Sequence, residues 1–404
     1  MTFDFDKEIN RLNTSSYKWD LYGDKYIPLW VADTDFEVPP AVTDRLQKLV
    51  DKKVYGYLLT GNGIYDAITD WFKREYDAEI EGKPWIKIIP GIVPALAVAS
   101  NLGLEEIEPA KVDGKWQQQT ESVTAVPNYS ALIEAPETAG NIMKQVQMKC
   151  EMKADESGYE YEYYSLDFDA LQEAVTDKTK VLYLCNPNNP VGRVYSYDEL
   201  KQVSEFAKKN NLIVVSDEAH CEVVYEGKHI PFFTVDEYAH ENSISLYSNG
   251  KLCNLPDLIM AFAVIPNAEL RDRFEKLSYA FGEEHVMNVE AGIASYAESD
   301  EWKRQMVAYL KANRDYLDSE LKKRFPKDKY PEFKMTHLEG TYLLWLDFGN
   351  LNSEWFMDNA GVFMSDGSFF GGAGHVRLNF ATRRELLTEA LDKIEEAVKK
   401  QIKI

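Results

Sequence analysis

The feature that most constrains the fold is a series of apolar runs between residues 180 and 265. The runs are KVLYLC (180–185), LIVV (212–215), SISLY (243–247) and IMAFAVI (259–265). Strands that are apolar on both faces are typical of a sheet covered by helices on both sides, as in parallel α/β proteins. Between the first two runs, the capping box SYDE (196–199) predicts the start of an amphipathic helix. This part of the chain is therefore expected to be an α/β domain.

The C-terminal part follows a different pattern. We expect a long amphipathic helix over 302–325, short strands near 341–348 and 375–379, and a terminal helix from Arg384. That order predicts a separate α+β unit, and the N-terminal segment, rich in proline and aromatic residues, is expected to pack against it. The predicted division is a large domain over 44–286 and a small domain formed by 1–43 and 287–404.

Charge and cysteine usage exclude several classes of protein. The chain has 404 residues and a net charge of −22, which disfavours binding to nucleic acid or to an anionic membrane. No apolar run is long enough to span a bilayer, and the N-terminus does not resemble a signal peptide, so we expect a cytoplasmic protein. The cysteines and histidines are scattered without metal-ligand spacing, and no metal site is predicted.

Polar side chains follow three of the predicted strands. NPNNPVG (186–192) follows the first, SDEAH (216–220) the second and SNGK (248–251) the third. Ligands of parallel sheets bind at the carboxyl ends of the strands, so one site can collect an amide, an acid, an imidazole and an amine.

This set of groups matches the needs of pyridoxal 5'-phosphate (PLP). Asp217 can keep a pyridine nitrogen protonated, Lys251 can form a Schiff base, and amide or imidazole donors can hold a phenolate oxygen. The turn before a helix at Gly91 can bind the phosphate, and Tyr129 can stack on the ring. Each piece alone has an ordinary alternative: a turn, a helix N-cap, a surface lysine or a packed core histidine.

Several motifs carry a resemblance to a known family over almost the whole chain. They are LWVADTDF (29–36), VYGY (54–57), NPNNPVGRV (186–194), SDEAH (216–220), GTYL (340–343) and VRLN (376–379). With them the chain resembles the fold-type I PLP enzymes of the class I/II aminotransferase superfamily. Within these it is similar to the MalY- and PatB-like group of cystathionine β-lyases and cysteine C–S lyases. The resemblance implies a large domain with a mostly parallel seven-stranded sheet between helices, and a smaller α+β domain built from both termini.

The resemblance also implies roles for individual residues. Lys251 is the Schiff-base lysine and proton shuttle, Asp217 pairs with the pyridine nitrogen, and Arg377 binds the substrate α-carboxylate. The remaining implied contacts are Asn189 and His220 to the phenolic oxygen, Tyr129 stacked on the ring, Gly91, Ile92, Val93 and Ser248 to the phosphate, and Ala32 and Asn189 lining the substrate pocket. Tyr57 is implied to reach the neighbouring subunit's site, which makes the protein a homodimer with shared active sites.

The function implied is α,β-elimination from cystathionine- or cysteine-type amino acids, giving a thiol, pyruvate and ammonia. The alternatives are an aminotransferase on the same fold and a PLP-binding regulatory protein with little turnover.

Three departures from the family stand out. Gly250 replaces a hydroxyl residue, and Asp366 is either a second charge near the substrate carboxylate or a turn cap. The polar stretch 105–122 is expected to be a solvated loop, with a lid near Tyr129 as the alternative.

Overall fold

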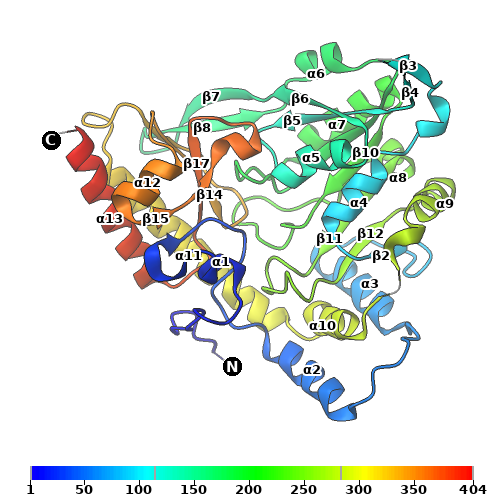
Figure 1. Ribbon diagram of the computed structural model, residues 1–404, viewed down its shortest axis with the longest axis horizontal. Coiled ribbons are helices and arrows are strands. Elements are labelled where there is room, and N and C mark those ends of the chain that lie inside the picture. The colour runs from blue at the N-terminus through cyan, green and yellow to red at the C-terminus, as the bar shows by residue number, and fades with distance from the viewer. Residues whose placement is uncertain (1, 113–114, 283, 403–404) are drawn as a thin grey trace.

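The computed structural model describes residues 2–112, 115–282 and 284–402, and Figure 1 shows their arrangement. The largest sheet has seven strands in the order β2-β12-β11-β10-β9-β5-β6. All neighbouring pairs are parallel except β12 with β11 and with β2. The predicted mostly parallel sheet is confirmed. Its strands are β2 (Ile86–Ile89), β5 (Glu121–Val126), β6 (Ile142–Gln147), β9 (Thr179–Cys185), β10 (Ile213–Asp217), β11 (Ser243–Ser248) and β12 (Ala261–Val264).

The antiparallel direction of β12 differs from what its apolar sequence suggests. Residues 249–260, between β11 and β12, contain no helix. A parallel connection needs a crossover of a dozen or more residues, usually with a helix. This link has only twelve residues, the lower limit for a crossover, and no helix to span the sheet, and the chain returns in the opposite direction, although β12 is as buried as its neighbours.

Helices cover both faces of this sheet (Figure 1), as continuous apolar strands require. Successive side chains of β9 point to opposite faces of the sheet: Tyr183 packs in an apolar cluster on one face, and Leu182 packs in a cluster on the other. One layer contains α4 (Ile92–Ala99), α5 (Ser130–Thr138) and α9 (Ala268–Leu277). The other contains α3 (Gly63–Tyr76), α6 (Phe168–Ala174), α7 (Tyr197–Asn210), α8 (Glu237–Glu241) and α10 (Val286–Ala297).

Helix α7 begins as the sequence predicts. The Ser196 side chain accepts a hydrogen bond from the Glu199 amide, and the Glu199 side chain bonds back to the Ser196 amide. Leu200, Val203 and Phe206 are buried against the sheet. The capping box thus determines where this helix begins, and the apolar stripe determines which side of it packs against the sheet.

A second, smaller sheet has the order β13-β14-β17-β16 and is antiparallel throughout. It lies with α11 (Asp300–Arg324), α12 (Ser353–Ala360) and α13 (Arg384–Ile402) around one apolar core. The long helix, the two strands and the terminal helix expected from the sequence are all present. The strands are β13 (Phe333–Met335), β14 (Leu343–Phe348), β16 (Ser365–Asp366) and β17 (His375–Asn379).

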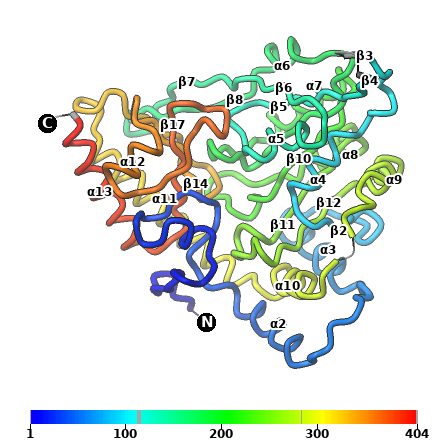
Figure 2. The backbone as a smooth tube through the Cα atoms, viewed as in Figure 1, coloured from blue at the N-terminus to red at the C-terminus, as the bar shows by residue number. Residues whose placement is uncertain are grey.

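The N-terminal segment packs against this second unit. Strand β1 (Ile27–Pro28) pairs in parallel with β15 (Val362–Phe363). Phe5 meets the rings of Phe36 and Trp302 edge-on. Figure 2 shows the N-terminal backbone running beside α11 and the C-terminal elements. The division into domains at residues 43 and 287 stays a prediction, because α10 also packs on α2 (Pro40–Lys52) and α3.

The stretch 105–122 is more ordered than a solvated loop. It contains a short hairpin of β3 (Ala110–Val112) and β4 (Lys115–Gln117), and its last two residues begin β5; residues 113–114 lie outside the described residues. The Gln118 side chain donates to the carbonyls of Leu104 and Ile107, which ties the hairpin to the chain before it. Three-residue strands are too short to produce a readable alternation, so the sequence did not indicate them.

The remaining elements are short. They are α1 (Tyr17–Asp20), the hairpin β7 (Lys149–Ala154) and β8 (Glu160–Ser165), and the 3-10 turns η1 (Gly23–Lys25), η2 (Leu104–Glu106), η3 (Phe232–Thr234), η4 (Tyr279–Phe281) and η5 (Gly367–Phe370). In the part of the chain that the structure describes, no helix combines the length and hydrophobicity that crossing a membrane requires.

Candidate active site

The three polar segments that follow strands lie side by side. In the sheet, Asp217 at the end of β10 is opposite Cys185 of β9 on one side and Leu246 of β11 on the other. Because these strands are parallel, the segments that begin at Asn186, Glu218 and Asn249 leave the sheet at the same edge. The structure therefore brings the predicted amide, acid, imidazole and amine into one region.

Asp217 is a buried acid with little compensation. The residue is 3% exposed, and its side chain accepts a hydrogen bond from the Ala219 amide at 3.1 Å. Desolvation raises the pKa of Asp217 to about 6, and the Ala219 hydrogen bond and the Lys251 charge oppose that rise. An acid in this state is stabilised by a cationic partner.

Lys251 lies in the loop after β11, within electrostatic reach of Asp217. Burial lowers the pKa of the Lys251 amine, and the charge of Arg377 lowers it further, while Asp217 acts in the opposite direction. Among the described residues none forms a hydrogen bond or ion pair with the Lys251 amine. A lysine whose pKa is lowered has a larger neutral fraction, which is the nucleophilic form.

Arg377, on β17, projects from the small sheet toward this region. It donates to the Asn189 side chain at 2.8 Å and to the Trp30 carbonyl at 2.9 Å, and Phe370 lies under its guanidinium. Its Nε is buried without a partner, and no carboxylate of the described residues forms an ion pair with it. Burial lowers the pKa of Arg377 to about 10, so it is still a cation at neutral pH. A buried guanidinium without a counter-ion is a site prepared for an anion.

His220 is a buried imidazole whose two ring nitrogens both lack a partner among the described residues. Burial lowers the pKa of His220 well below its usual value, and the charges of Lys251 and Arg377 act in the same direction. The ring meets Tyr342 edge-on at 5.5 Å, and the Tyr342 hydroxyl donates to the Ala32 carbonyl. A neutral imidazole with unsatisfied nitrogens indicates a missing hydrogen-bond partner.

Tyr129 stands directly before α5. Burial raises the pKa of Tyr129 to about 12, and the nearby Asp217 charge contributes in the same direction. The Asn128 side chain accepts from the Tyr129 amide at 2.7 Å and fixes the turn. The aromatic ring is therefore within electrostatic reach of the acid, as the sequence argument required.

The predicted phosphate residues lie at the start of α4 and the end of β11. Gly91 is the N-cap of α4, so the amides of Ile92 and Val93 belong to the first turn, and α4 packs beside β10 and β11. The Ser248 hydroxyl accepts from the Gly250 amide at 2.9 Å. Free amides at a helix N-terminus suit an anion.

Tyr57 is the one predicted residue that the structure leaves outside this region. The residue is 99% exposed and lies in the irregular segment before α3. A surface hollow beside it is lined by Leu258 and by residues 284–288. With this exposure, Tyr57 does not pack against the described residues of the site in its own chain.

Some residues that shape the site were not singled out from the sequence. The carbonyl of Trp30 and the hydroxyl of Ser365 hold the Arg377 guanidinium. Asp33 acts electrostatically on Lys251 and is itself held by Arg11 through two contacts of 2.9 Å. Trp30 and Asp33 lie within the LWVADTDF motif, which is the only signal that pointed to them. Asp366 accepts from the Ser368 amide and caps η5, which supports the turn-cap alternative.

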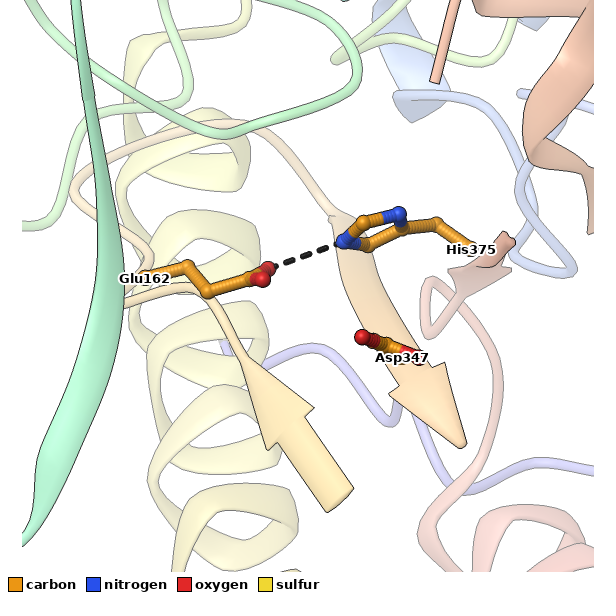
Figure 3. A group of neighbouring side chains, drawn as sticks. All are labelled: Glu162, Asp347 and His375. Carbon is orange, nitrogen blue, oxygen red and sulfur yellow. Dashed lines mark hydrogen bonds and ion pairs between the residues drawn. The ribbon is translucent and has the colours of Figure 1, made fainter. Parts of the chain in front are cut away.

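A second polar cluster lies beside the small sheet (Figure 3). Glu162 of β8 and His375 of β17 are 3.0 Å apart, and Asp347 of β14 lies close to both. The Lys334 amine pairs with Asp347 at 3.0 Å and supplies a cation within the cluster. We therefore interpret it as an ion-pair network that joins the β7–β8 hairpin to the small sheet. Sequence spacing did not indicate it, because its members come from four different strands.

Comparison with known proteins places this site in a family. The family described as aminotransferase class I and II matches residues 123–394, more than half of the chain. The chain belongs to this class I and II aminotransferase family. This confirms the resemblance read from the motifs.

Individual relatives of this aminotransferase-family chain are similar over their whole length. Cystathionine beta-lyase PatB of Bacillus subtilis is 26% identical, covering 98% of this chain and 99% of the relative. Protein MalY of Escherichia coli is 28% identical with the same coverage. Among solved structures, the PLP-bound C–S lyase of Staphylococcus hominis with L-cycloserine has a TM-score of 0.84 and 27% identity, covering 98% of this chain and 99% of that one. The structure of OvoB has a TM-score of 0.85 and 31% identity, with the same coverage. These structures confirm the fold class.

Proposed function

We propose that this chain is a PLP-dependent carbon–sulfur lyase. It performs α,β-elimination on cystathionine- or cysteine-type amino acids and releases a thiol, pyruvate and ammonia. The observation that carries the proposal is the buried Arg377 guanidinium, free of any described carboxylate, in the same site as the Lys251–Asp217 pair. Relatives named cystathionine beta-lyase and C–S lyase support the choice of reaction.

The described residues fit PLP. Asp217 is a desolvated acid suited to a protonated pyridine nitrogen, and His220 has two unpartnered nitrogens that suit a phenolic oxygen. Asn189 accepts a hydrogen bond from Arg377 in the same region, and Tyr129 offers an aromatic face. The first-turn amides of α4 and the Ser248 hydroxyl suit the phosphate. When bound, the cofactor supplies an aldehyde for an amine and a ring that accepts an electron pair from the substrate's Cα.

The chain's own residues bind the substrate and move its protons. Arg377 binds the α-carboxylate in the bidentate geometry of a guanidinium, which orients the Cα–H bond toward Lys251. Burial and the Arg377 charge keep part of the Lys251 amine neutral, so it can take the Cα proton as a general base. Asp217 stays ionised beside a positive charge because the opposite charge compensates its desolvation.

Elimination and transamination share the removal of the Cα proton and differ afterward. A thiolate on the substrate's Cβ is a good leaving group. In elimination it departs before a proton is returned to a different carbon, which is the next step of transamination. Transamination instead needs a 2-oxo acid as second substrate. The similarity to the aspartate aminotransferase of Bacillus sp. (strain YM-2), 24% identical, keeps transamination as the alternative that the assay below must separate. A regulatory protein with little turnover is the remaining alternative.

We also propose a homodimer with shared active sites. Tyr57 is 99% and Leu59 93% exposed, so neither side chain is packed against the described part of its own chain. Large apolar side chains exposed together mark an interaction surface, and Tyr57 from one subunit is placed to complete the partner's phosphate site.

We further propose the two-domain division at residues 43 and 287. A cytoplasmic location is proposed too, because the four cysteines within the described residues are unpaired.

The deciding assay supplies the purified yellow protein with cystathionine or cysteine and measures thiol and pyruvate. The proposal expects both products at equal rates without any 2-oxo acid. Lys251→Ala is expected to lose about 10²–10⁴-fold in rate, the usual contribution of a general base. Turnover that requires 2-oxoglutarate and releases no thiol would establish the aminotransferase instead. Absence of turnover with any substrate would favour the regulatory protein.

A further inference from the structure

The turn that carries Lys251 is closed only weakly by its own backbone. It consists of residues 249–253 and follows β11 directly; we call it the lysine turn. The Asn249 side chain fixes its beginning by accepting from the Met260 amide at 2.8 Å. At its other end, the backbone hydrogen bond from the Asn254 amide to the Lys251 carbonyl is long, at 3.4 Å, compared with a usual length of about 2.9–3.0 Å. The end of the turn therefore depends on further contacts.

The side chain of Asn254 supplies those contacts from a distant part of the chain. Its oxygen accepts from the Thr34 amide at 3.2 Å, and its nitrogen donates to the Phe36 carbonyl at 3.0 Å. Both partners are backbone groups of one segment, residues 30–36. Asn254 has a φ of 53°, in the left-handed region that asparagine and glycine adopt more readily than other residues. One side chain thus joins the lysine turn to the N-terminal part of the chain.

The same segment also holds the side of the site that would bind the substrate carboxylate. The Trp30 carbonyl accepts from the Arg377 guanidinium at 2.9 Å. The Asn379 side chain donates to the carbonyls of Val31 and Asp33, at 2.6 and 2.8 Å. Arg377 and Asn379 both belong to β17 of the small sheet. The segment is therefore bonded on one side to the strand that carries the guanidinium and on the other side to the lysine turn.

We propose that Asn254 is a positioning residue that holds the Lys251 amine at the correct distance and angle from Arg377. The inference rests on the proposed function, in which Lys251 removes a proton from a Cα that Arg377 orients. The amine itself has no hydrogen-bond partner among the described residues, so the lysine turn decides where it lies. Hydrogen bonds are directional, and the two bonds of Asn254 refer this turn to the segment that also contacts Arg377. A displacement of about 1 Å at a reacting group can lower a rate about 100-fold.

Asn254→Gly is the variant that tests this role. Glycine adopts the left-handed conformation freely, so the substitution removes both side-chain hydrogen bonds and keeps the backbone angle. Leu252 and Cys253 are 2% and 0% exposed and keep the turn packed in the core, so the variant is expected to fold. Asn211→Gly is the matched control, because exposed Asn211 also has a φ of 53°. It ends α7 and precedes β10, at the opposite end of that strand from Asp217.

The first measurement follows the visible absorbance after cofactor-free protein is mixed with saturating PLP. At saturation the rate reports the condensation of the Lys251 amine with the aldehyde, which releases water. We expect this rate to fall about 5-fold or more in Asn254→Gly, because the amine is no longer ordered beforehand, and to be unchanged in Asn211→Gly. Equal rates in wild type and both variants would overturn the proposal. This measurement needs no substrate, so its outcome is independent of whether the protein is a lyase.

The second measurement is the exchange of the Cα hydrogen of L-alanine for deuterium, followed by NMR and expressed per loaded site. L-Alanine has no leaving group on Cβ, so the exchange reports proton removal and return alone. The maximal rate should fall about 10- to 100-fold in Asn254→Gly, while the half-saturating concentration of alanine stays within about 3-fold, because Arg377 keeps its contacts. A purely structural role would change the amount of loaded protein and leave the rate per loaded site unchanged.

Three results of the exchange experiment would overturn the role of Asn254. They are a maximal rate within about 2-fold of wild type, an equal fall in Asn211→Gly, and a loss confined to the half-saturating concentration. Absence of exchange in the wild-type protein would instead count against the proposed function, and the condensation rates would still decide the role of Asn254.

Discussion

At the scale of the single residue, the most informative group is Arg377, because it is buried and lacks an acidic partner. Its two terminal nitrogens contact the Asn189 amide and the Trp30 carbonyl, which are neutral. These contacts orient the guanidinium without neutralising it. The positive charge is therefore available to a substrate carboxylate.

Arg377→Lys tests this role. A lysine keeps the charge but cannot form the two parallel hydrogen bonds of a guanidinium. We expect kcat/KM for the amino-acid substrate to fall roughly 10- to 100-fold, from the loss of one charge-assisted hydrogen bond, mainly through KM. Steady-state kinetics over a substrate series measures it. An unchanged KM would mean that the carboxylate binds elsewhere.

Asp217 allows a prediction about pH. Its pKa in the folded, cofactor-free protein is about 6, above the ordinary value of 3.8, so the folded state holds the proton more tightly than the unfolded chain. The stability associated with this group is full below about pH 4 and is lost as the pH rises through 6. Asp217→Asn removes that loss, and the cofactor-free variant should be up to about 3 kcal/mol more stable than wild type at pH 7.5.

Urea unfolding of both cofactor-free proteins at pH 4 and pH 7.5 measures this difference. The gain should shrink toward zero at pH 4, where wild-type Asp217 is protonated. The cofactor-loaded variant should be nearly inactive, because its amide cannot stabilise a positive ring nitrogen. A variant less stable than wild type at pH 7.5 would contradict the interpretation that burial of this carboxylate is only partly compensated in the cofactor-free protein.

At the scale of the element, the network in Figure 3 joins the β7–β8 hairpin to the small sheet. Glu162 is 6% exposed and accepts from His375 and, at 3.4 Å, from the Tyr164 hydroxyl. Glu162 also forms a β-bridge to Thr336. Removing its carboxylate would leave the His375 ring nitrogen and the buried Tyr164 hydroxyl with only each other, 3.4 Å apart, as partners in this network.

Glu162→Ala is therefore expected to lower the free energy of unfolding by about 1–3 kcal/mol. Chemical denaturation measures the loss. Glu160→Ala is the matched control, since Glu160 is an exposed glutamate on the same strand and should change stability by no more than about 0.5 kcal/mol. Equal effects of the two substitutions would mean that the network adds nothing to stability.

At the scale of the whole molecule, the proposed dimer makes a quantitative prediction. Lys251→Ala and Tyr57→Ala are each expected to be nearly inactive alone. In a mixed dimer, one site combines an intact Lys251 with the partner's intact Tyr57, and the other site lacks both. Random pairing of equal amounts should therefore restore about a quarter of wild-type activity.

Co-expression with two different affinity tags gives the mixed dimers for assay. Failure to recover activity above that of either variant would show that Tyr57 does not complete the partner's site. A monomeric mass in solution would contradict the dimer itself. Tyr57→Phe, which keeps the ring, is the control for the phenolic hydroxyl.

Much of the fold and site was predictable because the signals are local. Apolar runs indicated β9, β10 and β11, a capping box indicated the start of α7, and helical periodicity indicated α11. Parallel strands end at one edge of a sheet, so the segments at 186, 217 and 248 were expected to meet there, and they do. The family motifs added Tyr57 and Arg377, which no local signal distinguishes.

The sequence by itself determined the α/β class, the set of reactive side chains and the family, because each is written in short segments. Only the tertiary structure decided the direction of β12, the neutral contacts of Arg377 and the Glu162–His375 network. These features join residues far apart in the chain, such as Asn189 and Arg377. Their geometry depends on how complete layers pack, and spacing along the chain carries no record of that packing.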